Sequence, residues 1–265
     1  MHKIDAKKMG LTVFIAILAI MPLIVSCSGE VKDAESAIGR MVEAYGGRER
    51  TVFMTTFAGK GFIRNLTHVN VAESYPLDIY QKGFLYKNRI MMVENGILAD
   101  VRLTVANNQE LFKWTSKTGK SPIPKWEGDL IRYRFPGIFG WLAESGAMGE
   151  LIESGDEDGN CKVRFTNNDD KVTMVIDNST WLLKESIVES ISDTSFVSRD
   201  VYSEYRKVDG VWFPSRFSGY MGGERYYEFF LVKVEMGIEI PDSIFAITRE
   251  DTVKIHRPQG TANKK

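Results

Sequence analysis

The sequence predicts a mainly β fold with flanking helices, built as one antiparallel meander. From Thr51 onward, short runs rich in Val, Ile, Phe, Tyr and Thr alternate with Gly, Asn and Asp at intervals of about ten residues. Turns such as Asp158-Gly159-Asn160 and Asp209-Gly210 have the chemistry that tolerates positive φ. A single amphipathic helical pattern precedes these strands, so we expect one large β-rich domain.

The first 26 residues have the layout of a signal peptide. Lys3, Lys7 and Lys8 precede the uncharged stretch 11–25. A stretch of this length is shorter than the roughly 20 apolar residues that a transmembrane helix needs. We therefore expect residues 1–26 to be removed.

The stretch Ile24-Val25-Ser26-Cys27 resembles the lipobox of bacterial lipoproteins. The resemblance implies cleavage before Cys27 and lipid attachment to its thiol, with residues 27–32 as a lipidated tether. Two or three acyl chains give stable membrane anchoring, whereas one holds only marginally. Ser28 at the second mature position implies transport to the outer membrane, facing the periplasm. The alternative is an ordinary secreted protein in which this cysteine is incidental.

Removal of residues 1–26 leaves 31 Lys and Arg against 34 Asp and Glu, a formal charge of −3. Nothing in this balance suggests a nucleic-acid ligand, which would require a clustered basic surface. Besides the lipidated Cys27, only Cys161 remains, so no intrachain disulfide is expected.

The domain is expected to span residues 33–248. Apolar residues recur on one helical face over residues 33–45, and Gly46-Gly47 predicts the end of this helix. The first strand is expected at 51–65. Residues 116–147, which contain three prolines, are expected to form a loop with a short helix laid over an apolar surface. Residues 249–265 are polar and are expected to be disordered.

A family resemblance rests on three short motifs and their order. The helix ends in Val42-Glu43-Ala44-Tyr45-Gly46-Gly47, a late hairpin reads Tyr205-Arg206-Lys207-Val208-Asp209-Gly210-Val211-Trp212-Phe213-Pro214, and the domain closes with Ile238-Glu239-Ile240-Pro241-Asp242-Ser243-Ile244-Phe245. The chain resembles the outer-membrane lipoprotein carrier and receptor superfamily. The resemblance implies an incomplete antiparallel β-barrel, a half-barrel covered by helices, with an apolar cavity that shields acyl chains.

Aromatic residues are the candidates for the wall of this cavity. They are Phe57, Phe84, Tyr86, Phe112, Trp114, Phe135, Trp181, Phe217, Tyr227 and Phe229. The candidates for a lid are Ile138, Phe139, Trp141 and Leu142, because their segment is flanked by Gly and Pro. For each aromatic residue the alternative is that it fills the core.

Residues for catalysis or metal binding are sparse. His68 and His256 are the histidines of the mature chain, so we expect no enzyme, no metal site and no cofactor. The acidic turn 153–158 lacks the regular spacing of a calcium loop. Cys161 is expected to be a small core residue.

The leading hypothesis is a membrane-anchored binding protein that takes a lipid or an acylated lipoprotein into the half-barrel. The alternative is a structural lipoprotein with a filled core that docks an envelope protein partner. Hydrolysis of an envelope polymer would need two facing carboxylates, and the sequence suggests no such pair.

Overall fold

The computed structural model describes residues 31–65, 74–94, 96–145, 149–153, 159–166, 169–192, 196–249 and 251–252. From Lys32 onward they belong to one compact unit. Within these residues one antiparallel sheet has 13 strands, in the order β6-β5-β4-β3-β2-β1-β13-β12-β11-β10-β9-β8-β7. The expected mainly β fold is confirmed.

The elements have the following bounds. The strands are β1 Thr56–Asn65, β2 Ser74–Lys82, β3 Leu85–Glu94, β4 Ile97–Ala106, β5 Leu111–Thr115, β6 Gly119–Pro122, β7 Glu150–Glu153, β8 Asn160–Thr166, β9 Asp170–Asp177, β10 Leu183–Ser190, β11 Val197–Val208, β12 Val211–Met221 and β13 Glu224–Met236. The helices are α2 Ala34–Ala44, α3 Arg48–Met54, α4 Lys125–Tyr133, α5 Gly137–Ser145 and the 3₁₀ helix η2 Asp242–Phe245.

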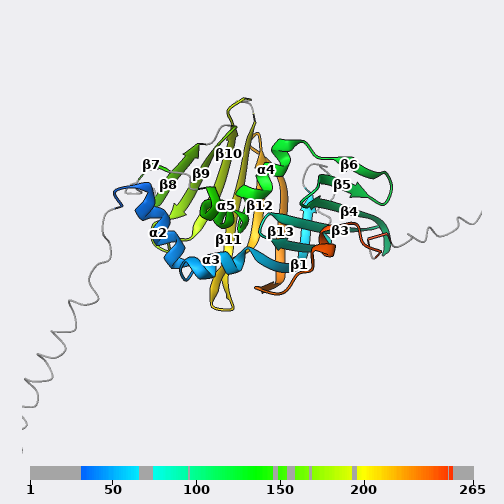
Figure 1. The fold of residues 1–265 in the computed structure, drawn as a ribbon. Helices are drawn as coiled ribbons and strands as arrows, with labels where there is room; N and C mark the ends of the chain where they lie inside the picture. The colour runs from blue at the N-terminus through cyan, green and yellow to red at the C-terminus, as the bar shows by residue number, and fades with distance from the viewer. Residues whose placement is uncertain are drawn as a thin grey trace, which may run out of the picture. The chain divides into compact units, whose positions relative to one another are not determined.

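The connection between the two halves of the sheet places the helices over one face. The chain runs outward from β1 to β6 at one edge, crosses the sheet through α4 and α5, and starts again with β7 at the other edge. It then returns strand by strand to β13, which pairs with β1. The edge strands β6 and β7 do not pair with each other, so the barrel is incomplete, and the helices lie along its covered face (Figure 1).

Helix α2 forms as the sequence predicts. Asp33 caps its first turn by accepting a hydrogen bond of 2.7 Å from the Ser36 backbone N–H. Ala37 and Met41 of this helix are fully buried. At its end, the Tyr45 hydroxyl accepts a hydrogen bond of 3.2 Å from the backbone N–H of Leu183 in β10. These contacts hold α2 on the sheet.

An aromatic cluster fills the space between α5 and the centre of the sheet. The Phe135 ring lies 5.1 Å from Phe213 and 5.7 Å from Phe139, both in edge-on contact. Tyr45 packs 4.9 Å from Phe139. Edge-to-face contacts of this kind stabilise a core beyond simple burial, so this part of the half-barrel is solid.

Gly61 is required where the two halves of the sheet meet. A Cβ atom on Gly61 would lie 1.7 Å from the carbonyl oxygen of Phe230 in β13. The register of β1 against β13 shifts at Lys60 and Gly61. The glycine therefore relieves crowding in a bent strand.

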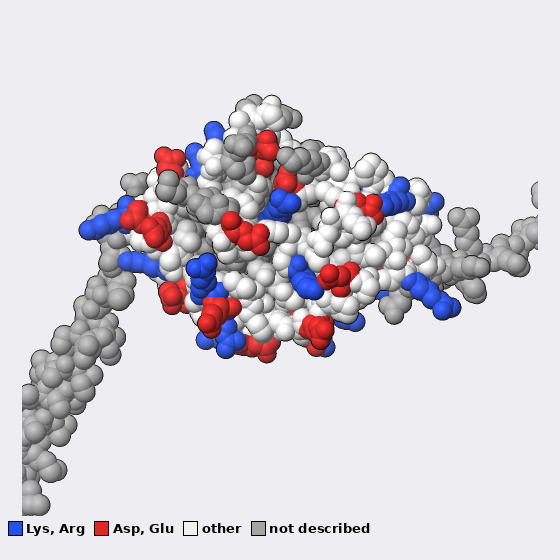
Figure 2. All heavy atoms as spheres, in the orientation of Figure 1, with Lys and Arg blue, Asp and Glu red and all other residues white. Residues whose placement is uncertain are grey.

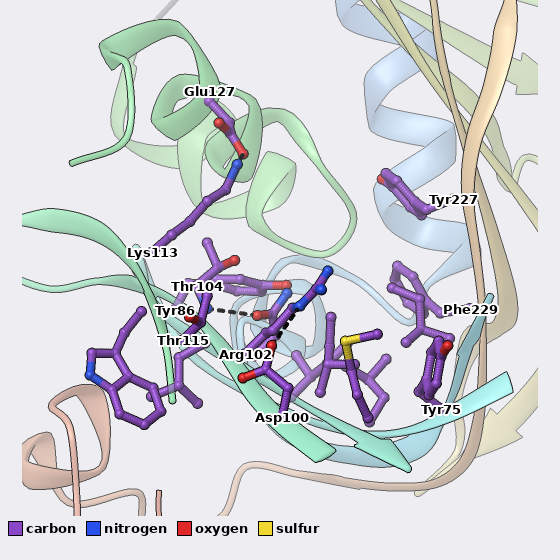
Figure 3. Close-up of a pocket in the computed structure, with 18 of the residues that line it drawn as sticks. Tyr75, Tyr86, Asp100, Arg102, Thr104, Lys113, Thr115, Glu127, Tyr227 and Phe229 are labelled. Atoms are coloured by element: carbon purple, nitrogen blue, oxygen red, sulfur yellow. Dashed lines mark hydrogen bonds and ion pairs between the residues drawn. The ribbon is translucent and has the colours of Figure 1, made fainter. Parts of the chain in front are cut away.

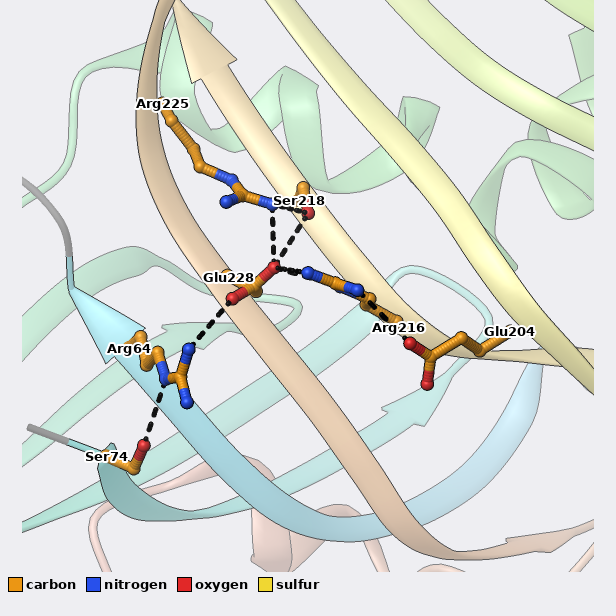
Figure 4. Close-up of polar contacts among 7 residues, drawn as sticks. All are labelled: Arg64, Ser74, Glu204, Arg216, Ser218, Arg225 and Glu228. Carbon is orange, nitrogen blue, oxygen red and sulfur yellow. Dashed lines mark hydrogen bonds and ion pairs between the residues drawn. The ribbon is translucent and has the colours of Figure 1, made fainter. Parts of the chain in front are cut away.

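A buried carboxylate on the uncovered face ties this junction together. Glu228 in β13 accepts hydrogen bonds of 2.6 Å from Arg216 and 2.7 Å from Arg225, and Arg64 in β1 lies 3.7 Å away (Figure 4). Only 2% of its side chain is exposed. Because burial of an unpaired carboxylate is costly, the arginines hold β1, β12 and β13 in register.

The C-terminal segment packs against the uncovered face of β3. The carboxylate of Asp251 lies 2.7 Å from the Lys87 ammonium and also accepts hydrogen bonds from Thr248. Lys87 alternates along β3 with residues that face the helices, so this ion pair lies on the opposite face. The packed domain therefore extends past residue 248, and residues 253–265 of the expected tail lie outside the described part of the chain.

Two helices were not expected. Residues 48–54 form α3, where a strand was expected to begin at Thr51, because Thr51 and Met54 are buried as part of a helical turn. Residues 125–133 form α4 within the expected loop. The short helix expected around residues 138–142 is confirmed as α5. Among the described residues, no helix has the length and apolar character to span a membrane.

Charges are mixed on the surface. On the face drawn in Figure 2, the Lys and Arg side chains are interspersed with Asp and Glu side chains rather than gathered by sign. This distribution agrees with the near-neutral formal charge of −1 of the whole chain.

Candidate functional site

A cavity of about 470 Å³ lies on the helix-covered face of the sheet, between β13, β1–β5 and α4. Its size falls within the usual range of small-molecule sites. It is lined by Ile63, Tyr75, Leu77, Ile79, Tyr86, Asn88, Ile90, Met92, Asp100, Arg102, Leu103, Thr104, Lys113, Trp114, Thr115, Lys117, Thr118, Glu127, Ile131, Arg134, Tyr226, Tyr227 and Phe229.

One end of the cavity is apolar and aromatic. Ile63 in β1 pairs directly with Tyr75 in β2 and with Phe229 in β13, so the three side chains form one wall. Leu77 in β2 pairs with Ile90 in β3 and continues this wall. Tyr75, Tyr227 and Phe229 lie together at this end in Figure 3. The surface suits a hydrocarbon chain.

The other end is polar and lies over β4 and β5. Arg102 pairs across the strands with Thr115, and Thr104 pairs with Lys113. Beneath them, Asp100 is only 3% exposed. Its carboxylate accepts hydrogen bonds of 2.6 Å from the Ser116 hydroxyl and 3.1 Å from Arg102 Nε. The buried carboxylate is therefore satisfied within the protein.

Helix α4 covers the cavity. Glu127 and Ile131 from this helix are part of the lining. The Glu127 carboxylate lies 2.6 Å from the ammonium of Lys113 in β5, which ties the helix to the sheet across the polar end (Figure 3).

Arg134 lines both the main cavity and a second one of about 30 Å³. Its Nε donates a hydrogen bond of 2.8 Å to Asp200, which also accepts one from the Tyr227 hydroxyl. Burial alone would lower the pKa of Arg134, but the Asp200 carboxylate raises it above its ordinary value. Burial raises the pKa of Tyr227. Arg134 is thus a fixed cation and Tyr227 a neutral donor at physiological pH.

The structure brings together part of the predicted cavity wall. Tyr86, Trp114, Tyr227 and Phe229 line the main cavity. The aromatics Phe57, Phe135 and Phe217 line the small one, together with Tyr86, Tyr227 and Phe229.

Three predicted wall residues line neither cavity. Phe112 packs with Val101 and its neighbours in a separate core cluster. Trp181 lies under Arg40, whose guanidinium carbon is 4.9 Å from the ring centroid, and Phe84 lies 5.3 Å from the guanidinium carbon of Arg132.

None of the four lid candidates lines either cavity. Ile138 and Phe139 are buried in the aromatic core. Trp141 packs between Tyr133 and Phe165, with ring centroids 5.3 and 5.4 Å away, and Leu142 is half-buried. A lid role for these residues stays a prediction, whereas α4 is the helix that contacts the cavity.

The polar lining residues were not among the sequence candidates. Asp100, Arg102, Lys113 and Glu127 look like ordinary surface charges in the sequence. The alternation of Asp100, Arg102 and Thr104 with Val101, Leu103 and Val105 marks two faces of β4. It does not indicate that the polar face is the one turned toward the helices.

Groups for chemistry are few in the described part of the chain. No cluster of three or more His, Cys, Asp or Glu residues that could hold a metal is present there. Cys161 is fully buried in β8. Cys27, His68, His256 and most of the acidic turn lie outside the described residues.

Comparisons with known proteins support the fold. No protein-family model and no curated protein sequence matches the chain. In structure it is similar to a LolA superfamily protein, NE2245 from Nitrosomonas europaea, with a TM-score of 0.56 and 13% identity over 82% of this chain and 99% of that one. It is also similar to a DUF1329 family protein from Desulfovibrio piger, with a TM-score of 0.53 and 11% identity over 80% and 96% of the two chains.

These identities are low, so the likeness concerns the fold alone. The resemblance expected from the three sequence motifs is confirmed for the fold. The chain has the LolA-superfamily fold: an open antiparallel sheet covered by helices on one face.

Proposed function

We propose that this chain is a non-enzymatic binding protein that holds the acyl part of a lipid or an acylated lipoprotein in the main cavity. The observation that carries the proposal is the cavity of about 470 Å³ with its apolar wall on β13 and β1–β3. Burial of acyl chain contributes about 0.8 kcal/mol per methylene, so eight methylenes would contribute roughly 6 kcal/mol.

The position of the protein is part of the same proposal. A lipid on Cys27 would anchor the chain to a membrane of the cell envelope, and Ser28 favours the periplasmic face of the outer membrane. A tethered protein acts locally, so we favour lipid handling or lipoprotein sorting at that membrane. The matching test is metabolic labelling with a fatty acid, which the wild-type chain should incorporate and Cys27→Ala should not.

The docking alternative expects a filled core. Aromatic side chains fill the space around Phe135. The part of the sheet formed by β1–β5 retains its cavity. The cavity therefore supports ligand binding over docking with a filled core.

Native mass spectrometry of the purified chain, followed by organic extraction, tests the proposal. An acyl lipid or lipopeptide that co-purifies in stoichiometric amount is the expected result. A folded chain that carries no ligand and also takes up neither added phospholipid nor acylated peptide would refute it.

A further inference from the structure

We propose that the main cavity orients its ligand, with the acyl chain over β13 and β1–β3 and an anionic headgroup, a phosphate or a carboxylate, over β4 and β5. This inference rests on the proposed function and adds the chemistry of the headgroup. It follows from how polar side chains are distributed along the strand order and from which of them already have partners.

The charged residues that the sheet contributes to the lining lie on β4 and β5, whereas β13 and β1–β3 contribute apolar and aromatic residues and Asn88. The wall residues Ile63, Tyr75 and Phe229 come from β1, β2 and β13, at one side of the strand order. Arg102 and Lys113 come from β4 and β5, at the other side (Figure 3). A ligand that lies across the strands would place a chain at one end and a polar group at the other.

The polar end carries an excess of positive charge. Its charged lining residues are Arg102, Lys113 and Lys117 against Asp100 and Glu127. Arg102 and Lys113 lie on neighbouring cross-strand pairs of the cavity face, opposite Thr115 and Thr104 respectively. Directly opposite side chains have Cβ atoms about 5 Å apart, so this end is compact enough for one small headgroup.

The two carboxylates are already occupied. Asp100 accepts from Ser116 and Arg102, and Glu127 pairs with Lys113 at 2.6 Å. The interactions found for these cations use Nε of Arg102 and the ammonium of Lys113, which leaves further N–H groups of both. Both cations therefore keep N–H donors for a ligand, while each carboxylate already faces a cation.

Lys117 supplies a cation close to this donor group. It is exposed, it lines the cavity, and it lies in the turn between β5 and β6. The neighbouring hydroxyls of Thr115 and Thr118 lie 2.7 Å apart and rigidify this turn. A phosphate or carboxylate bound here would accept charge-assisted hydrogen bonds, which are stronger than neutral ones.

The test compares ligands with one chain and four headgroups. Dodecyl phosphate, dodecanoate, dodecanol and dodecyltrimethylammonium are titrated into the intact chain by calorimetry, below their micelle concentrations. We expect one or both anionic ligands to bind about tenfold more tightly than the other two, equivalent to about 1.4 kcal/mol. A preference for the phosphate over the carboxylate would indicate a phospholipid rather than a free fatty acid.

Two charge-reversal variants locate the source of the anion preference, one in the cavity and one outside it. Lys117→Glu should remove most of the preference for the anionic ligands over dodecanol. Lys171→Glu is the matched control, because Lys171 is exposed on β9, which three strands separate from β13. Added salt should weaken binding of the anions and leave dodecanol binding unaffected.

The outcomes separate the two proposals. Equal affinity for all four ligands, a preference for the cation or the alcohol, or an anion preference that survives Lys117→Glu would overturn the headgroup inference while acyl binding stands. Absence of binding by every ligand would overturn both.

Discussion

The ammonium of Lys113 lies 2.6 Å from the carboxylate of Glu127, so an ion pair joins β5 to α4 over the polar end of the cavity. The two side chains are 43% and 27% exposed. The ion pair is therefore accessible to water and can open without unfolding the sheet, while Leu130 and Tyr133 keep α4 packed through buried side chains.

Glu127→Gln should loosen α4 with little loss of stability. A partly exposed ion pair contributes about 0–1 kcal/mol to stability. A loss of 1 kcal/mol raises the population of an open state about fivefold. Hydrogen exchange in residues 125–133 should become faster by up to about fivefold, and bound ligand should dissociate faster. Glu110→Gln, which removes an exposed ion pair between Glu110, just before β5, and Lys120 on β6, is the control. Unchanged exchange in α4 would show that this ion pair does not hold the helix.

Asp251→Asn should destabilise the domain substantially. Both side chains of the Asp251–Lys87 pair are nearly fully buried, at 2% and 4% exposed. Loss of one partner leaves a buried charge without compensation, which costs about 3–5 kcal/mol. Chemical denaturation measures this loss. Asp242→Asn, which removes the exposed pair with Lys82 in the same segment, should cost less than about 1 kcal/mol.

The contribution of Asp251 to the stability of the fold should depend on pH. Burial raises the pKa of Asp251, but hydrogen bonds from Lys87 and Thr248 outweigh it and lower the pKa below the ordinary value. The carboxylate therefore stabilises the folded state above its unfolded-state pKa of about 4, and this contribution is lost as the pH falls through the lower folded-state pKa. The difference in unfolding free energy between wild type and Asp251→Asn should be greatest near neutrality and shrink in acid. A difference independent of pH would assign the stability to packing instead.

Removal of the Arg134–Asp200 pair should change the length of the fatty acid that binds most tightly. Arg134 lines both cavities and pairs with Asp200. The double variant Arg134→Met with Asp200→Asn avoids an uncompensated carboxylate and opens the way toward Phe57 and Phe217. The optimum in a series of fatty acids should move to longer chains. If the optimum stays where it is in the wild type, the small cavity does not extend the site.

The meander and helix α2 could be predicted because they depend on local patterns, whereas the half-barrel was implied by the resemblance of three short motifs to a known superfamily. The spacing of Ala37, Met41 and Tyr45 and the turn glycines act over a few residues. Helix α3 was missed for the same reason. Val52 and Phe53 favour strands locally, whereas burial of Thr51 and Met54 against the rest of the protein stabilises a helix.

The site was predicted less well than the fold. Aromatic residues were taken as the cavity wall, and Tyr86, Trp114, Tyr227 and Phe229 do line it. Phe112 lies in the cluster with Val101 instead, on the face of β5 opposite Lys113 and the cavity, and the sequence of β5 alone does not show which of its faces turns toward the helices. Helix α4 lies between Pro124 and Pro136, and these prolines had suggested a loop.

The binding of one acyl ligand to a cavity-filled variant tests the central claim most directly. Met92 lines the cavity and is half-buried, so Met92→Trp should fill part of the space without disturbing the core around Phe135. Val52→Trp adds the same side chain at an exposed position of α3, where Val52 is 51% exposed. The account predicts that dodecanoate affinity falls at least about tenfold in Met92→Trp, equivalent to about 1.4 kcal/mol, and stays at the wild-type value in Val52→Trp. A folded Met92→Trp protein that binds dodecanoate as tightly as the wild type would contradict it.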